Sequence, residues 1–412
     1  MKLSAITLSH FRGVPHLEVA LDPKMTILVG RNGIGKSSVL DALAIMLVNV
    51  QYLWSSERQR HYAIPGLYKK SDVQIGCDDY SIKLNFSLED AIGEDFPVEL
   101  FTSLSDAHFI SPASSFDEVK RIVQSQTFLS SKDDLLVYYR QDRGFDDKAS
   151  TSRADPATSL FGSLRAISQL ETWWDRRDAE EARRVRDSDP DYRDPQLQAV
   201  RALIKEVDGF VGVSFSSAHG LEGVYFERED GVKIHVSLLS AGERSFIILL
   251  ADLARRLQLT KPDIPLHEIP AVVLIDEIEL NLHPYWQSKI ISTLIRVFKS
   301  CQFVVTTHSP QVISAVESQH VRMIEKSADG VEVNSPLRTK GQTSNYLLEG
   351  VFQAHERFPE IDKLFDSFNE AVSRGEASDA AGILGEILEK IEGDPPEILL
   401  LRKRLKGIQS KP

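Results

Sequence analysis

The segment GRNGIGKS, residues 30–37, decides the fold of this chain. It fits the pattern G-x-x-x-x-G-K-[ST] in full, between an apolar run at residues 25–29 and a helical pattern that begins at Lys36. Glycines in such a loop let backbone N–H groups converge on a triphosphate, and the helix N-terminus adds a favourable dipole. The segment therefore predicts an ATP site in which Lys36 binds the β- and γ-phosphates and the Ser37 hydroxyl binds Mg²⁺. The residues expected to bind ATP are Asn32, Gly33, Gly35, Lys36, Ser37 and Ser38.

A second segment, VVLIDE at residues 272–277, supplies two carboxylates. An apolar strand that ends in Asp-Glu, downstream of a phosphate-binding loop, matches a Walker B element. We expect Asp276 to hold Mg²⁺ through water, beside Ser37, and Glu277 to orient and deprotonate the attacking water. Together the two segments predict an ATPase with ATP and Mg²⁺ as its ligands.

The spacing of apolar residues predicts an α/β architecture. Residues 1–50 are typical of two strands followed by a strand–loop–helix unit, and residues 271–306 of strand, helix and strand. This order predicts a parallel sheet covered by helices. We also expect strands at 72–90, 135–139, 211–215, 224–227 and 232–237, a mixed, partly helical segment at 90–132, a loop at 142–160, and helices at 163–206, 241–259, 284–299 and 343–406.

Composition excludes several classes of protein. The chain has 412 residues and a formal net charge of −12, which rules out coating of nucleic acid by bulk charge but leaves a local basic groove open. Its apolar stretches are too short for a membrane span, and its N-terminus becomes polar too soon for a signal peptide. The two cysteines, Cys77 and Cys301, are typical of a reduced cytoplasmic protein and are too few for a Cys-based zinc site.

The segment LSAGER, residues 239–244, makes the prediction more specific. It resembles the signature loop of ABC-type ATPases, in the form found in the SMC, RecF and OLD-like branch. In that family the loop closes over the γ-phosphate held by a partner's P-loop, so that a helix N-terminus faces an anion. The resemblance implies that Ser240, Gly242 and Glu243 act in trans, in an ATP-dependent head-to-head dimer with two shared sites.

Two segments after the Walker B element resemble further parts of that family. NLHP, residues 281–284, resembles the D-loop region. TTHSP, residues 306–310, resembles the switch element, which implies that His308 senses the γ-phosphate and acts as a second catalytic residue.

The N-terminal segment HFRG, residues 10–13, resembles the NFRG opening of RecF-like and SMC-like heads, with His10 in place of the usual asparagine. Arg12 is expected either to reach phosphates in its own chain or to form a structural salt bridge. Gln141 is the candidate for the Q-loop glutamine, and Gln74 is its rival.

The segments between and after these motifs indicate which branch of the family the chain resembles. The gap from Gly30 to Ser240 is longer than in transporter ATPases and has no heptad run for a coiled coil, and the tail after His308 lacks the acidic cluster of a Toprim domain. The chain resembles the ATPases of bacterial defence systems, and among them the PtuA family of Septu-type systems. The stretches that carry this likeness are 135–143, Trp173-Trp174-Asp175, 341–348 and the tail helices from Gly375 to Glu397.

The resemblance implies an ATP-binding sensor and scaffold that forms a homo-oligomer, at least a dimer, and controls an HNH nuclease subunit of the PtuB type. DNA is contacted through that complex, and no membrane is involved. The chain itself shows no nuclease motif. Its role as an ATPase in anti-phage defence, in the cytoplasm, is therefore the leading hypothesis.

The same resemblance implies an α/β fold, an ABC-type P-loop NTPase head with a mixed or parallel sheet, flanking helices, a helical insertion and a helical C-terminal tail. The expected parts are an N-terminal lobe with the P-loop at 1–140, a loop and helical insertion at 141–206, a C-terminal lobe with signature, Walker B and switch histidine at 207–340, and a tail for partner docking at 341–412.

Two alternatives stay open. One is a RecF-like DNA-repair ATPase that binds DNA itself, for which the arginines of residues 173–186 are the candidate contacts, although they alternate with acids that predict a solvated helix face. The other is a module that uses ATP to dimerise without hydrolysing it. The acidic residues Asp187, Asp189 and Asp191 are expected to form a solvated loop rather than a metal site.

Overall fold

The computed structural model describes residues 1–54, 70–89, 95–103, 135–140, 166–216, 221–327, 330–336, 338–352, 359–391, 393 and 395–409. The chain forms two compact units, Met1–Ser344 and Asn345–Pro412. None of the described helices combines the length and the apolar character that a membrane span needs.

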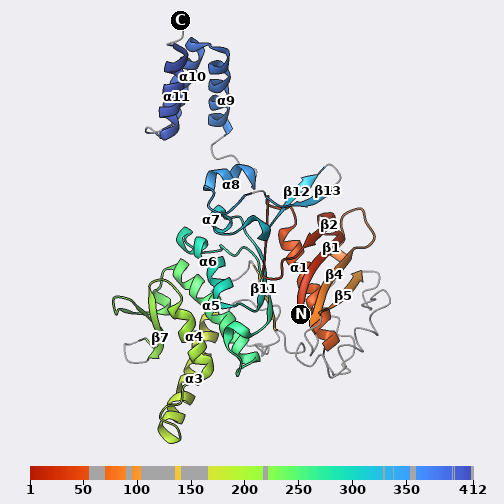
Figure 1. Cartoon of the computed structure of the whole chain (residues 1–412), viewed down its shortest axis with the longest axis vertical. Coiled ribbons are helices and arrows are strands. Elements are labelled where there is room, and N and C mark those ends of the chain that lie inside the picture. Colours follow the sequence, from red (N-terminus) through yellow and green to blue (C-terminus); the bar gives the residue numbers. More distant parts are fainter. Residues whose placement is uncertain are drawn as a thin grey trace. The chain divides into compact units, whose positions relative to one another are not determined.

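A six-stranded mixed sheet is the framework of the first unit (Figure 1). Its strand order is β13-β12-β3-β11-β10-β6, and every neighbouring pair is parallel except β12 with β13. The strands are β3 (Met25–Gly30), β6 (Leu135–Tyr139), β10 (Ala271–Ile275), β11 (Cys301–Thr306), β12 (Val321–Ser327) and β13 (Gly330–Asn334). Because parallel strands end at the same edge of a sheet, the loops after β3, β10 and β11 meet there.

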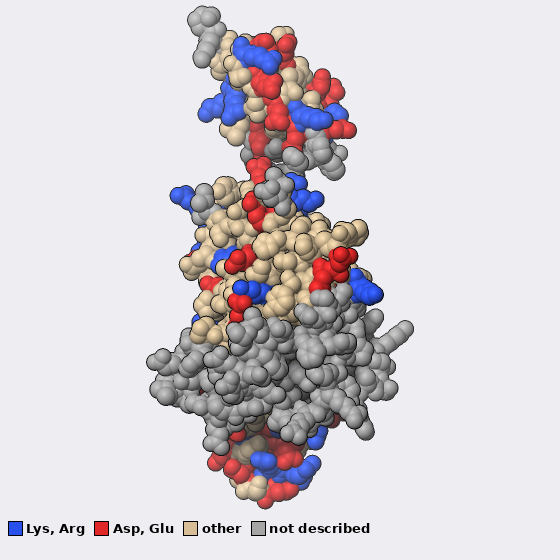
Figure 2. All heavy atoms as spheres, turned by 90° about the vertical axis from the view of Figure 1, so that its right-hand side faces the viewer, with Lys and Arg blue, Asp and Glu red and all other residues tan. Residues whose placement is uncertain are grey.

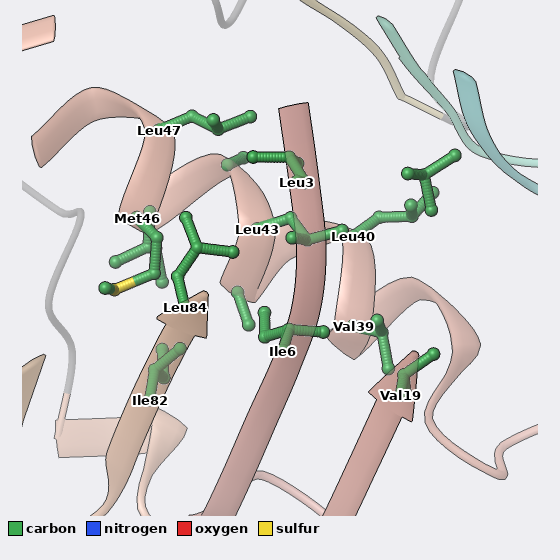
Figure 3. Close-up of a cluster of buried hydrophobic side chains, with 14 of the residues drawn as sticks. Leu3, Ile6, Val19, Val39, Leu40, Leu43, Met46, Leu47, Ile82 and Leu84 are labelled. Carbon is green, nitrogen blue, oxygen red and sulfur yellow. The ribbon is translucent and has the colours of Figure 1, made fainter. Parts of the chain in front are cut away.

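A four-stranded antiparallel sheet, in the order β2-β1-β4-β5, packs beside this framework. Its strands are β1 (Lys2–Phe11), β2 (Val14–Ala20), β4 (Ser81–Glu89) and β5 (Asp95–Ser103). Helix α1 (Lys36–Trp54) contacts strands of both sheets. Figure 3 shows Leu40 and Leu43 of α1 in one buried cluster with Leu3, Ile6 and Leu84 from β1 and β4. Burial of each such side chain stabilises the fold by about 1.5–3 kcal/mol, so this cluster fixes the helix that follows the P-loop.

Residues 95–103 form β5, a strand that the prediction of a mixed, partly helical segment at 90–132 did not specify. Val98, Leu100 and Thr102 alternate with more exposed residues and face the core. Pro97 is tolerated because β5 lies at the edge of its sheet. Residues 104–134 and the loop predicted over 142–160 lie outside the described residues.

Among the described residues, the rest of the first unit holds a three-stranded antiparallel sheet, β7-β8-β9, and five α-helices. They are β7 (Phe210–Ser216), β8 (Gly223–Arg228), β9 (Lys233–His235), α3 (Ala166–Asp187), α4 (Pro195–Lys205), α5 (Ala241–Thr260), α6 (Pro284–Val297) and α7 (Pro310–Ser314). Helix α5 is buried from Ser245 to Gln258 and contacts α3, α4, α6 and β6. The predicted helices and strands of this region are confirmed, although β9 ends at His235, before the expected boundary.

The second unit is a bundle of three helices, α9 (Pro359–Arg374), α10 (Ala377–Lys390) and α11 (Pro396–Gln409), and α8 (Ser344–Gly350) begins at the last residue of the first unit. The bundle has a core of its own, made by Phe368, Ala371, Ala380, Leu384, Ile387, Ile398 and Leu401. The apolar stripes of the sequence predicted these helices, and the described residues from 343 onward contain no strand.

Candidate functional site

The P-loop lies at the carboxyl edge of β3 and depends on its glycines. Gly30, Gly33 and Gly35 have φ values of 145°, 74° and 111°, which L side chains rarely adopt. A Cβ on Gly35 would lie 2.6 Å from the Cγ2 atom of Val14. The loop conformation that exposes its backbone N–H groups is therefore available to this glycine pattern and not to bulkier residues.

Lys36 is buried at the base of this loop. Its Nζ atom donates hydrogen bonds to the carbonyls of Gly30, at 2.9 Å, and Arg31, at 3.0 Å. Burial lowers the pKa of Lys36 to about 8, against the opposing charges of Asp276, Glu279 and Glu277. The ammonium is thus held in place among acceptors that a phosphate can replace.

The two residues expected at the metal lie together. The Ser37 hydroxyl donates to Oδ1 of Asp276 at 3.1 Å, although the two residues are 239 positions apart in the sequence. The same oxygen accepts a hydrogen bond of 2.6 Å from the Thr306 hydroxyl. Hydroxyl and carboxylate oxygens are the ligands that Mg²⁺ prefers, so this donor set fits the ion. No group of three or more His, Cys, Asp or Glu side chains that could hold a metal is found among the residues that the structure describes.

Glu277 follows Asp276 in a strained backbone conformation, with φ of 47°. Its N–H donates to the Thr306 hydroxyl at 2.7 Å, which holds the residue at the end of β10. Its side chain is partly exposed, whereas Asp276 is buried. This difference in exposure suits Glu277 for contact with water and Asp276 for contact with a metal ion.

His308 lies just after the end of β11, near Lys36 of the P-loop. Its pKa is lowered by burial and by the charge of Lys36, against the opposing effect of Asp276. The His308 N–H donates to Oε1 of Glu279 at 2.5 Å. Sequence reasoning missed Glu279, although its position three residues after Asp276 could have pointed to it.

Arg12 forms ion pairs, as the interpretation that gives it a structural salt bridge predicts. It contacts Asp41 of α1 at 2.6 Å and Asp72 at 2.9 Å. Asp41 also accepts a hydrogen bond of 2.9 Å from the Tyr138 hydroxyl. These contacts join the turn after β1 to α1 and β6, and contact of Arg12 with phosphate stays a prediction.

The two Q-loop candidates differ in what the structure describes. Gln141 lies outside the described residues. The backbone N–H of Gln74 donates to the carbonyl of His10 at 2.9 Å, which fixes the loop after Asp72 beside the HFRG segment.

The signature segment begins α5 as a helix N-terminus. Ser240 is the N-cap and forms a capping box with Glu243, so each side chain bonds to the backbone N–H of the other. Glu243 also pairs with Arg228 at 2.8 Å. A Cβ on Gly242 would lie 3.0 Å from the backbone nitrogen of His283, so the helix starts against the D-loop region. Ser240 itself is exposed, as a contact for a second molecule must be.

A buried polar cluster joins α5 to β6. Asp252 contacts Arg255 at 2.6 Å and Arg256 at 2.7 Å, and it accepts a hydrogen bond of 3.0 Å from the Tyr139 hydroxyl. Burial alone would raise the pKa of Asp252, but the charges of Arg256 and Arg255 outweigh it and keep that pKa below its ordinary value. Asp252 is therefore charged in the fold, and its partner on β6 could not be predicted from the sequence.

The arrangement of Lys36, Ser37, Asp276 and Glu277 at the carboxyl edge of a mainly parallel sheet defines the chain as a P-loop ATPase. A family model described as "AAA domain, putative AbiEii toxin, Type IV TA system" matches residues 25–314. The match covers more than half of the chain, which therefore belongs to this family.

Individual proteins with similar sequences show more narrowly what this chain is related to. It is 27% identical to a protein named Retron Ec83 probable ATPase from Escherichia coli, over 97% of this chain and 85% of the relative. It is 23% identical to Septu protein PtuA of Bacillus mycoides, over 83% of this chain and 42% of that protein. Among solved structures, the SMC head domain from Thermotoga maritima matches with a TM-score of 0.44 and 16% identity, over 81% of this chain and 99% of that one. The chain is therefore a P-loop ATPase of this AAA family, and its sequence is similar to Septu PtuA and retron ATPases, in line with the resemblance found from its motifs.

Proposed function

We propose that this chain is the ATPase subunit of a cytoplasmic anti-phage defence complex, that it hydrolyses ATP in sites shared by two copies, and that it regulates a partner HNH nuclease of the PtuB type. The observation that carries the ATPase part is the hydrogen bond between Ser37 and Asp276. It brings the P-loop and the Walker B strand to one point. The defence part is supported by the kinship with Septu and retron proteins.

Each residue at the carboxyl edge has a role in this proposal. Lys36 exchanges its loop carbonyls for the β- and γ-phosphates, and the P-loop N–H groups bind the remaining phosphate oxygens. Ser37 and Asp276 would hold Mg²⁺, which supplies neutralisation of the phosphate charge when it is bound. Glu277 orients the attacking water and accepts its proton. His308, whose pKa is lowered, meets the γ-phosphate as a neutral hydrogen-bonding side chain at neutral pH.

The shared site requires that Ser240 and the N-terminus of α5 contact the phosphates held by a second copy. A complementation experiment tests this directly. Lys36→Ala removes the phosphate-binding ammonium, and Ser240→Arg blocks the signature surface, so we expect each variant alone to be inactive. In an equimolar mixture, mixed dimers contain one intact site, and about a quarter of the wild-type ATPase activity is expected. Failure of the mixture to regain activity would contradict sites shared in trans.

The C-terminal bundle supplies a docking surface for the proposed nuclease. On α11, Leu399 and Leu400 are 56% and 59% exposed, on the side opposite the buried Ile398 and Leu401. Large apolar side chains that stay exposed on an otherwise packed helix are candidate contacts for a partner. The bundle has its own core and does not need these two leucines for its packing.

A binding experiment tests this docking surface. Leu399→Asp together with Leu400→Asp should abolish co-purification with the nuclease encoded by the adjacent gene and should remove protection against phage. Ala381→Asp, on an exposed position of α10, adds a charge to the same bundle and should leave both intact. If the double variant binds the nuclease as the wild type does, α11 is not the docking surface.

The charged side chains of α3 do not support binding of DNA by this helix. Arg183 and Arg184 both pair with Glu180, and Arg186 pairs with Asp187. Figure 2 shows acidic and basic side chains interspersed at the lower end of the molecule, where α3 lies in Figure 1. These pairs favour the solvated helix face that the sequence predicted, and we keep DNA contact for the complex.

A further inference from the structure

The loop after β10 and the loop after β11 are joined by hydrogen bonds to one another. The Thr306 hydroxyl donates to Asp276 and accepts from the Glu277 N–H, and the Ile278 N–H donates to the Thr306 carbonyl at 3.0 Å. These contacts all involve residue 306, the last residue of β11. They fix the ends of the two strands, but they do not reach the switch histidine.

Glu279 extends this connection to His308. Its Oε1 atom accepts a short hydrogen bond of 2.5 Å from the His308 N–H. Burial raises the pKa of Glu279, and hydrogen bonds from the His308 N–H and the Thr307 hydroxyl oppose that shift. Glu279 has lost much of its hydration and depends on these two neighbouring donors. It therefore strongly constrains the main chain of the residues that carry them.

A second observation concerns the other oxygen of Glu279. Oε2 is shielded from solvent and has no hydrogen-bond partner among the described residues. Leaving a buried acceptor unpaired costs stability, so a buried carboxylate oxygen at this place needs a reason beyond packing. A side chain kept for packing alone would be more stable at this place as an apolar residue.

We propose that Glu279 is a positioning residue for the switch histidine: it holds the main chain of residues 307–308 so that the His308 side chain is directed at the γ-phosphate. The inference rests on the proposed ATPase function, since it assigns His308 a phosphate to contact. Glu279 itself touches no phosphate in this proposal. It acts by limiting the main-chain positions that His308 can take before nucleotide arrives.

The first test measures the main chain without nucleotide. In hydrogen–deuterium exchange, the His308 amide of the wild type should be protected by its bond to Glu279. Glu279→Ala removes the acceptor and should raise the exchange rate of this amide at least tenfold. Glu279→Gln keeps an acceptor oxygen at the same reach and should stay within about threefold of the wild type. Glu279→Asp keeps the charge but shortens the side chain, and it should behave as the alanine variant does.

The second test measures catalysis. Glu279→Ala and Glu279→Asp should lower kcat for ATP by about 10²-fold with little change in KM, because a misplaced group costs the transition state more than the ground state. Glu279→Gln should retain kcat within about threefold. Glu317→Ala, an exposed acid that pairs with Lys340 away from the site, is the control and should match the wild type.

The outcomes separate the two proposals. Normal exchange and normal kcat in both the alanine and the aspartate variant would overturn the role of Glu279. Equal losses of nucleotide affinity and kcat in all three variants, glutamine included, would also overturn it, because they indicate a general structural role. If the wild type hydrolyses no ATP while the alanine variant still loses protection at His308, the clamp on the main chain stands and the hydrolysis proposal fails.

Discussion

Two helices of this protein carry the same ionic pattern in opposite surroundings. On α3, Glu180 pairs with Arg183 at 3.0 Å and Arg184 at 3.2 Å, and the three side chains are 36–62% exposed. On α5, Asp252 pairs with Arg255 at 2.6 Å and Arg256 at 2.7 Å, and the three side chains are 1–6% exposed. An acid followed by arginines three and four positions later thus occurs once in solvent and once in the core.

The difference shows that spacing along a helix does not set the energy of an ion pair. In water the two partners of Glu180 replace good hydration with a weak, screened attraction. In the core the charges of the Asp252 cluster have lost their hydration, so each depends on the others. The buried cluster also has a partner outside its own helix, the hydroxyl of Tyr139.

Asp252→Ala should give the largest effect. It leaves Arg255 and Arg256 buried without their carboxylate, and we expect a loss of about 3–5 kcal/mol in the free energy of unfolding. Urea denaturation monitored by circular dichroism measures it. If the variant is too unstable to purify, Asp252→Asn gives a milder form of the same change. A loss below about 1 kcal/mol would show that the buried and exposed patterns are energetically alike.

The pH dependence of stability should also distinguish the two clusters. The pKa of Asp252 in the fold lies below its value in the unfolded chain, about 3.9. Its ionisation therefore stabilises the fold above that value, and this stabilisation is lost as pH falls through the lower pKa of the folded state. The stability difference between the wild type and Asp252→Asn should be constant from pH 5 to 7 and should shrink below about pH 4. A difference that does not change down to pH 3 would contradict this assignment.

Tyr139→Phe tests the long-range member of the buried cluster. The change removes one hydrogen bond to Asp252 and leaves the ring in place, so a loss of about 0.5–1.5 kcal/mol is expected. The double variant with Asp252→Ala should lose less than the sum of the two single changes, because both act on the same carboxylate. Additive losses would mean that the hydroxyl and the carboxylate do not interact.

Glu180→Ala should have the smallest effect, below about 1 kcal/mol, and 0.5 M salt should reduce it further. Thermal unfolding at two salt concentrations is sufficient to measure it. An effect as large as that of Asp252→Ala would imply that α3 is covered by another molecule in solution.

The chemistry of the site could be predicted from sequence where it depends on contiguous motifs. The P-loop and the Asp-Glu pair each lie within a short segment, and their strands were recognisable as apolar runs, so their meeting at one sheet edge followed from parallel order. The partners of Asp41, Asp252 and Glu279 could not be predicted in this way. Each bonds to a residue on another element, such as Tyr138, Tyr139 or His308, and nothing local in the sequence marks such a pair.

The fold shows the same limit. The amphipathic stripes of α9 and α10 were sufficient to predict helices, because the period of apolar residues is a local property. Strand β5 was missed because Pro97 weakens the strand pattern, and its place at the sheet edge, where proline is tolerated, depends on the tertiary fold. The sequence alone could not decide between the two interpretations of Arg12, because its partners Asp41 and Asp72 lie 29 and 60 residues away.

The signature glycine has a consequence for how this chain can vary during evolution. A Cβ added to Gly242 at the start of α5 would lie 3.0 Å from the backbone nitrogen of His283, which is tighter than most Cβ contacts. The position is therefore constrained twice, by packing within one chain and by the proposed contact with a second copy. A descendant that lost ATP binding would be free to change Lys36 or Glu277, but it would still be under selection to keep glycine at position 242.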